Sequence, residues 1–189
     1  MAQRDRNDRR MFVAVAAATL GALALARAYA ADEVANASAL AEQLVGGWSL
    51  VSRVTIGPDG NSLVDPGLAA TPKGILIYDR YGHVAAQLSR QGRTVEMLAA
   101  ECREAENVRG TNDTAQTILG YDAYFGTYTV NAQEGVVTHH LVSALFPGDV
   151  GKDIKREFRI SGDTLTIKFH TTARDGTSVA RTLVWKRLK

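Results

Sequence analysis

The chain is poor in cysteine and lacks several motifs of catalytic chemistry. Cys102 is the single cysteine among 189 residues, so an internal disulfide is excluded and a Cys/His metal cluster is absent. There is no G-x-S-x-G nucleophile elbow and no glycine-rich phosphate loop. We therefore expect no metal and no cofactor. Cys102 itself fits a small buried apolar residue better than a nucleophile.

Long apolar runs are also scarce, and the one present lies near the amino terminus. Met11 to Ala26 spans 16 residues, which is short for a membrane-spanning helix of about 20. A basic start precedes the run, and Ala28-Tyr29-Ala30 follows it. This order is typical of a secretory signal. We expect residues 1–30 to be a cleaved signal peptide, and the protein to be periplasmic or secreted; a retained membrane anchor is the alternative.

The export route stays open. Arg9-Arg10 followed by Met11-Phe12-Val13 resembles a twin-arginine signal, although Asp8 stands where that pattern prefers Ser or Thr. An ordinary secretion signal that holds two arginines is the alternative.

The basic character of the chain belongs to this first segment. Residues 1–30 hold five Arg and two Asp, a net charge of +3, whereas the whole chain carries +2. Residues 31–189 are therefore close to neutral, at −1. A near-neutral domain without a basic amphipathic stripe argues against a nucleic-acid partner and against stable membrane insertion after cleavage. The sequence leaves the oligomeric state open.

Residues 46–189 have the pattern of a single β-rich domain, after a lead-in at 31–45 that reads as a short helix or an irregular segment. Between Trp48 and Ile56 apolar residues alternate with polar ones, and we expect Trp48, Val54 and Ile56 to share one face. Seven further strands are expected between turn signals: 74–78, 83–89, 123–131, 136–146, 154–160, 164–171 and 178–188.

Residues 94–120 interrupt this series, because Val95, Leu98, Ala99 and Cys102 recur at helical spacing. We expect a helical insert there, between strands three and four. The fold class predicted is all-β: an eight-stranded antiparallel up-and-down barrel, wide enough to be filled by side chains or to hold one small ligand.

Several segments resemble the bacterial and fungal lipocalin-like domain family. They are Gly46-Gly47-Trp48-Ser49-Leu50, Pro72 to Tyr78, Gly82 to Leu88, Tyr124 to Tyr128, Val137-Thr138-His139-His140, Leu145-Phe146-Pro147, Gly151, Arg156, Gly162 to Leu165 and Leu183-Val184-Trp185. The resemblance implies a barrel whose floor is closed by Trp48, with Lys186 or Arg187 packed over it. It also implies binding of a small hydrophobic molecule, and it says little about activity.

Arg156 is the most informative candidate for a binding residue. It shares a strand face with Ile154, Phe158 and Ile160, while the opposite face is charged, so we expect Arg156 to point into an apolar interior. One interpretation is a clamp for an anionic group of a ligand. The other is an internal arginine that supports the barrel.

His139 and His140 are adjacent and therefore face opposite sides of a strand. We favour His139 as the inward one, with Val137 and Leu141. It can serve as an acid, a base or a polar contact, or be a hydrogen-bonded core histidine.

Three tyrosines and one glutamine complete the candidate ligand-binding set: Tyr78, Tyr124, Tyr128 and Gln87. Gly126 leaves space between the rings of Tyr124 and Tyr128, which indicates a ligand gap or a bend. Gln87 qualifies only if its face lines the cavity. Core packing with satisfied hydroxyl groups is the alternative for the tyrosines.

The sequence is compatible with three functions. The first is an exported carrier of a small hydrophobic or amphipathic ligand, with an anionic ligand among the alternatives. The second is a cofactor-free isomerase or cyclase that uses a Tyr or His with Arg156. The third is a filled barrel that serves as a structural or interaction module. Catalytic residues are not identifiable at this stage.

Overall fold

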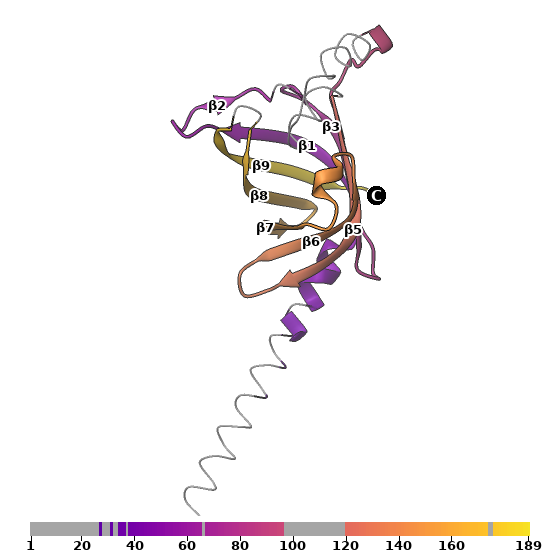
Figure 1. Cartoon of the computed structure of the whole chain (residues 1–189). Helices are drawn as coiled ribbons and strands as arrows, with labels where there is room; N and C mark the ends of the chain where they lie inside the picture. The colour runs from indigo at the N-terminus through magenta and orange to yellow at the C-terminus, as the bar shows by residue number, and fades with distance from the viewer. Residues whose placement is uncertain are drawn as a thin grey trace, which may run out of the picture.

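Eight antiparallel strands of the described residues close into a barrel (Figure 1). The computed structural model describes residues 27, 31, 34–36, 38–65, 67–96, 120–173 and 176–189. Each barrel strand pairs with the next along the chain, and β1 pairs with β9 to close the circle. The barrel strands are β1 (Gly46–Ile56), β3 (Lys73–Tyr78), β4 (His83–Ser89), β5 (Tyr121–Asn131), β6 (Val136–Ala144), β7 (Asp153–Ser161), β8 (Thr164–Thr172) and β9 (Ser178–Arg187).

The predicted all-β, eight-stranded antiparallel barrel is confirmed. Two small elements add to it: β2 (Ser62–Leu63), which pairs with β1, and the 3-10 turn η1 (Pro147–Asp149). The helical insert expected at 94–120 falls mostly on residues 97–119, which lie outside the described residues, and it stays a prediction. Nearly all of the expected signal segment lies outside them too. In the described part of the chain, no helix is both long and apolar enough to cross a membrane.

The first strand changes face halfway along its length, which the sequence pattern did not indicate. The pairing of β1 with β9 shifts register between Leu50 and Ser52. A bulge adds one residue, so every later side chain moves to the opposite face. As a result Arg53 is buried, whereas Val54 is 39% exposed. The expectation that Val54 and Ile56 share the face of Trp48 is therefore wrong.

A second irregularity explains Gly126. The pairing of β5 with β6 shifts register between Phe125 and Gly126, and β6 comes close to β5 there. A Cβ atom at Gly126 would lie 1.9 Å from the backbone oxygen of His140. The glycine is required by this close approach of two backbones, so it marks a bend of the barrel.

The barrel has two different ends. At one end, here called the Trp48 end, Trp48 is fully buried and its indole nitrogen donates to the Leu44 carbonyl, 2.9 Å away. Residues 38–44 are helical and lead into β1. The guanidinium of Arg187 lies 4.0 Å from the Trp48 ring and donates to the carbonyl of Val45. This is the floor that the family resemblance implied, with Arg187 rather than Lys186 in place.

The opposite end, here called the cavity end, is formed by the other termini of the same strands. Up-and-down topology places the end of β1 beside the start of β9, and the end of β6 beside the start of β7. The segment 145–152, which contains η1, connects β6 to β7 here. The interior above Trp48 is therefore closed at one end by packed side chains and bordered at the other by loops.

Candidate functional site

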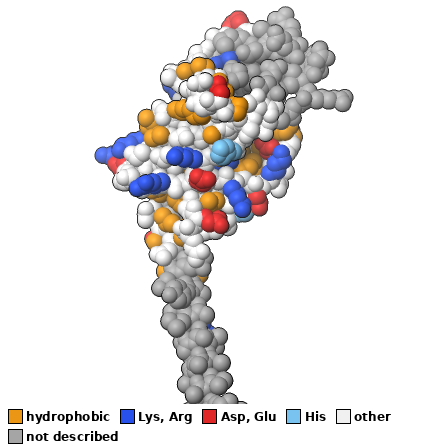
Figure 2. Space-filling model, turned by 90° about the vertical axis from the view of Figure 1, so that its left-hand side faces the viewer, with side chains coloured by type: hydrophobic (Ala, Val, Ile, Leu, Met, Phe, Trp, Pro, Cys, Tyr) orange, Lys and Arg blue, Asp and Glu red, His pale blue; other side chains and the backbone are white. Residues whose placement is uncertain are grey.

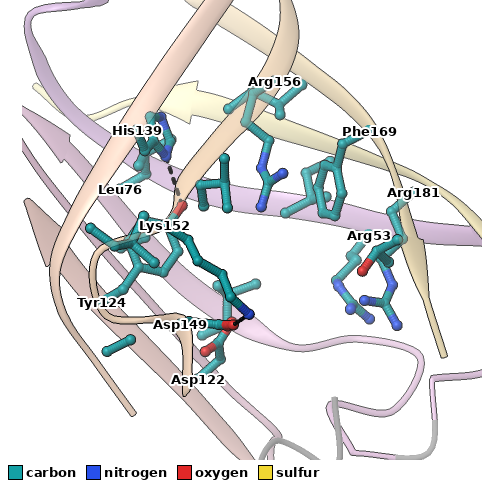
Figure 3. Close-up of a pocket in the computed structure, with 18 of the residues that line it drawn as sticks. Arg53, Leu76, Asp122, Tyr124, His139, Asp149, Lys152, Arg156, Phe169 and Arg181 are labelled. Atoms are coloured by element: carbon teal, nitrogen blue, oxygen red, sulfur yellow. Dashed lines mark hydrogen bonds and ion pairs between the residues drawn. The ribbon is translucent and has the colours of Figure 1, made fainter. Parts of the chain in front are cut away.

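A cavity of about 370 Å³ lies inside the barrel and extends toward the cavity end (Figure 3). Half of the residues in its wall are apolar: Leu68, Leu76, Ala86, Leu88, Leu141, Ala144, Ile154, Ile167, Phe169, Leu183 and Trp185. Charged or polar side chains also line it: Arg53, Asp122, Tyr124, His139, Asp149, Lys152, Arg156, His170, Thr171, Thr172 and Arg181. A hollow of this size that combines apolar side chains with convergent polar groups has the dimensions of a small-molecule site.

Arg156 points into this cavity from β7 (Figure 3). Side chains of β7 alternate between half-buried and exposed, because one face of the strand meets the interior and the other meets solvent. The guanidinium carbon lies 3.8 Å from the centre of the Phe169 ring, and Nη1 donates to the Lys155 carbonyl at 3.1 Å. Among the described residues, no carboxylate lies within ion-pair distance of Arg156. Burial lowers the pKa of Arg156, yet a guanidinium keeps its charge in a protein.

His139 faces the interior from β6 and is 1% exposed, whereas His140 lies on the outer side. Tyrosine hydroxyls contact both of its ring nitrogens: Tyr78 lies 2.8 Å from Nε2, and Tyr124 lies 3.0 Å from Nδ1. Burial, together with the charge of Arg156, lowers the pKa of His139 to about 3. The imidazole is therefore neutral at neutral pH, and one nitrogen carries the proton while the other accepts a hydrogen bond.

The two tyrosine hydroxyls beside His139 keep their protons at neutral pH. Burial raises the pKa of Tyr124 to about 12, although the charge of Arg156 opposes the rise. Burial also raises the pKa of Tyr78 well above its ordinary value. Tyr124 lines the cavity, whereas Tyr78 is 1% exposed and lies behind His139, away from the cavity wall. The array runs from the cavity into the core in the order Tyr124, His139, Tyr78.

The other two candidates lie elsewhere. Tyr128 packs edge-on against Tyr78, with ring centres 4.9 Å apart, and donates to the Asp79 carbonyl at 3.0 Å, so it supports the core behind the array. Gln87 is on the outer face of β4, where it is exposed and accepts a hydrogen bond from Tyr121. The interior side of β4 carries the larger apolar side chains. Gln87 therefore does not line the cavity, which corrects its inclusion in the candidate set.

Sequence reasoning missed a buried ionic cluster at the cavity end. Arg53 from β1 and Arg181 from β9 both contact one carboxylate oxygen of Asp65, and Arg181 lies 3.4 Å away. The other oxygen accepts from the backbone nitrogens of Gly67 and Leu68, at 3.0 and 2.7 Å. Burial alone raises the pKa of Asp65, but the two arginines and these hydrogen bonds outweigh it and leave the pKa below its ordinary value. The cluster ties the loop after β2 to the cavity wall.

A signal for one member of this cluster was present in the sequence. Arg181 stands between Val179 and Leu183 in an alternating pattern, which is the same argument that placed Arg156 inside. Arg53 gave no such signal, because the bulge in β1 exchanges the inward and outward positions of every residue after it. Asp122, which also lines the cavity and is 7% exposed, shares the face of Tyr124 but precedes the expected start of that strand.

Two other kinds of site were considered on the described residues, a metal site and a charged surface for a polyanion. No group of three or more His, Cys, Asp or Glu side chains in the described ranges is arranged to hold a metal ion. On the face drawn in Figure 2, basic and acidic side chains are interspersed with apolar ones. A surface of mixed charge gives no broad field of one sign for a polyanion.

Comparisons with curated proteins and solved structures give only low similarity in the cases named here. A search of curated proteins finds no match. Among solved structures, a redesigned β-barrel shares 12% identity at a TM-score of 0.37, with 79% of this chain and 95% of that chain covered. A protein of unknown function of the DUF3598 family from Nostoc punctiforme shares 15% identity at a TM-score of 0.36, with 77% of this chain and 44% of that chain covered.

The comparison with protein families is the informative one. The family model described as a lipocalin-like domain matches residues 45–188, which includes every strand of the barrel and the whole cavity wall. The chain therefore belongs to the lipocalin-like domain family.

Proposed function

We propose that the barrel binds a small amphipathic molecule that carries an acidic group. The observation that carries this proposal is the guanidinium of Arg156, which faces the cavity and forms no direct ion pair among the described residues, although the carboxylate of Asp122 lines the same cavity and acts on Arg156 from a greater distance. A partly buried charge that has no direct ion pair is incompletely compensated. A carboxylate or similar anion of a ligand completes that compensation and matches the fork of N–H donors on a guanidinium.

The apolar part of the ligand has room beside this group. Leu76, Leu88, Leu183 and Trp185 line the cavity from neighbouring strands, and its volume of about 370 Å³ lies within the range of small-molecule sites. Phe169 already packs against Arg156 at 3.8 Å, so an apolar ring or chain next to the guanidinium extends an existing contact. A cavity of this size argues against the filled-barrel alternative.

The geometry favours a carrier over an acid–base enzyme. A general base must accept a proton from its substrate, and its pKa must lie near the working pH. Both nitrogens of His139 are occupied by tyrosine hydroxyls, and its pKa lies near 3. His139 is therefore a poor proton acceptor, and an isomerase or cyclase reaction that depends on it is the less favoured function.

A pair of arginine variants tests the carrier proposal. Binding of 2-naphthoate and of the uncharged 2-naphthylmethanol is measured by fluorescence titration of the domain from residue 31 onward. Arg156→Met should weaken the binding of naphthoate by about 10- to 100-fold, the range expected for a charged hydrogen bond, and leave naphthylmethanol nearly unchanged. Arg159→Met, on the outer face of the same strand, is the matched control. Equal binding of naphthoate by the wild type and Arg156→Met would remove Arg156 as the anchor.

The natural ligand is best sought in protein purified from its own host. Native mass spectrometry followed by extraction should recover an acidic, mostly apolar molecule. If nothing co-purifies and a panel of fatty, aromatic and terpenoid acids gives no thermal shift, the carrier proposal is refuted.

We also propose that this carrier works outside the cytoplasm. The support is the ordered basic, apolar and small-residue pattern of residues 1–30. The near-neutral charge of the remaining chain is consistent with a partner that is a small molecule rather than a nucleic acid.

A further inference from the structure

The direction of each hydrogen bond around His139 follows from how its two tyrosines are placed. A neutral imidazole has one N–H donor and one acceptor nitrogen. Because Tyr78 and Tyr124 contact different nitrogens, one hydroxyl must donate to the ring and the other must accept from it. The two arrangements differ in which hydroxyl hydrogen is left without a partner on the ring.

In the first arrangement Nε2 carries the proton. Tyr124 then donates to Nδ1, and Tyr78 accepts from Nε2. The hydroxyl hydrogen of Tyr78 needs another acceptor, yet Tyr78 is 1% exposed and its hydroxyl contacts no other acceptor among the described residues. A buried donor would be left unsatisfied.

In the second arrangement Nδ1 carries the proton. Tyr78 donates to Nε2, and Nδ1 donates to the hydroxyl oxygen of Tyr124. The hydroxyl hydrogen of Tyr124 is then directed away from the ring, and Tyr124 lines the cavity, where water or a ligand accepts it. In this arrangement Tyr78 and both ring nitrogens of His139 have a partner within the array, and only the hydroxyl hydrogen of Tyr124 is left to the cavity. The cost of an unsatisfied buried hydroxyl favours this arrangement by a factor on the order of 10 to 100.

We infer that Tyr78 and His139 together fix the hydroxyl of Tyr124 as a hydrogen-bond donor to the cavity, which makes the site beside Arg156 selective for a carboxylate. Arg156 has only donors, and Tyr124 now adds another. A carboxylate has only acceptors, so it satisfies both groups at once. A primary amide in the same place would direct its own N–H donors toward the donors of Arg156 and Tyr124, and these groups cannot hydrogen-bond to one another. Tyr78 thus acts as a positioning residue, since it does not line the cavity. This inference rests on the proposed function.

The tautomer is measured directly on the ligand-free protein. We expect ¹⁵N NMR of the His139 ring at pH 7 to show a protonated Nδ1 and an unprotonated Nε2. A ring protonated on Nε2, or on both nitrogens, overturns the inference whether or not any compound binds.

Selectivity is measured with two probes of the same shape, 2-naphthoate and 2-naphthamide. In Tyr78→Phe the donor to Nε2 is lost, so the imidazole no longer has a preferred tautomer and Tyr124 can turn its hydrogen toward Nδ1. The preference for naphthoate over naphthamide should fall by about tenfold, and the ¹⁵N signals of His139 should show a mixture of tautomers.

Tyr128→Phe is the matched control. Tyr128 packs against the same ring of Tyr78, but its hydroxyl donates to Asp79 and does not contact His139. Its selectivity should stay within twofold of the wild type. An unchanged selectivity in Tyr78→Phe, or an equal loss in both variants, refutes the positioning role. If naphthoate and the other acids of the panel do not bind at all, the proposed function fails, while the tautomer measurement still reports on the array.

Discussion

Acidification should destabilise this protein through one buried histidine, His139. The pKa of His139 is lowered from 6.5 to about 3 because the ring is buried between tyrosines and near the charge of Arg156. In the unfolded chain the same ring takes up a proton near pH 6.5. Between these two values the unfolded state binds more protons than the folded state, so the free energy of unfolding falls as the pH falls.

The size of this effect follows from the separation of the two pKa values. Each unit is worth about 1.4 kcal/mol, so His139 removes on the order of 4–5 kcal/mol between pH 6.5 and pH 3. Asp65 contributes in a different window. Its pKa in the folded state lies below its ordinary value, so its stabilising contribution is present above about pH 4 and is lost below it. The slope between pH 6 and 4 is therefore the signature of His139.

Urea denaturation at a series of pH values measures this slope. Trp48 and Trp185 are both almost fully buried, so their fluorescence reports the unfolding transition. The wild type should lose stability steeply from pH 6 to 4. His139→Gln should be less stable at pH 7 but should lack most of that slope, whereas His83→Gln, at an exposed position, should retain it. Parallel slopes in the wild type and His139→Gln, or an NMR titration of His139 near pH 6.5, would refute the reasoning.

Two further outcomes are expected. Asp65→Asn should lower the free energy of unfolding by about 3–5 kcal/mol, because the variant leaves the buried Arg53 and Arg181 without their shared carboxylate. The control is Asp163→Asn, at an exposed ion pair, which should lower the free energy of unfolding by less than about 1 kcal/mol. Equal losses in the two variants would contradict the structural role of the cluster. Replacement of Arg9-Arg10 by two lysines should block export, as measured by cell fractionation, if the twin-arginine route is used, and unchanged export would leave the ordinary secretion signal.

The strands were predictable because their environment is simple. Each has one face toward the interior and one toward solvent, so hydrophobicity alternates with period two, and Gly-containing turns separate the runs. In β7 the alternation of half-buried and exposed side chains has no break. That regularity is why the inward direction of Arg156 could be inferred from the sequence.

The site was only partly predictable because register irregularities are set by three-dimensional pairing. The residues around Leu50 contain no sequence feature that predicts the bulge, which turns Arg53 inward. The array around His139 joins three strands, β3, β5 and β6, and no spacing along the chain encodes which hydroxyl meets which nitrogen. The error at Gln87 is of a different kind. Its polar side chain suggested a ligand contact, although the larger apolar residues of the same strand lie on the other face, which indicates that the other face is the one turned toward the interior.

The pairing of β1 with β9 has a consequence for the order of events in biosynthesis. It joins Trp48 to Arg187, so the first and last strands of the domain are neighbours. Until β9 has left the ribosome, the sheet has two open edges and the floor lacks Arg187. Such long-range closure is slow compared with local folding and leaves strand edges open to other chains until it is complete. The barrel can therefore close only after β9 has been synthesised, and until then its open strand edges are available for pairing with other chains.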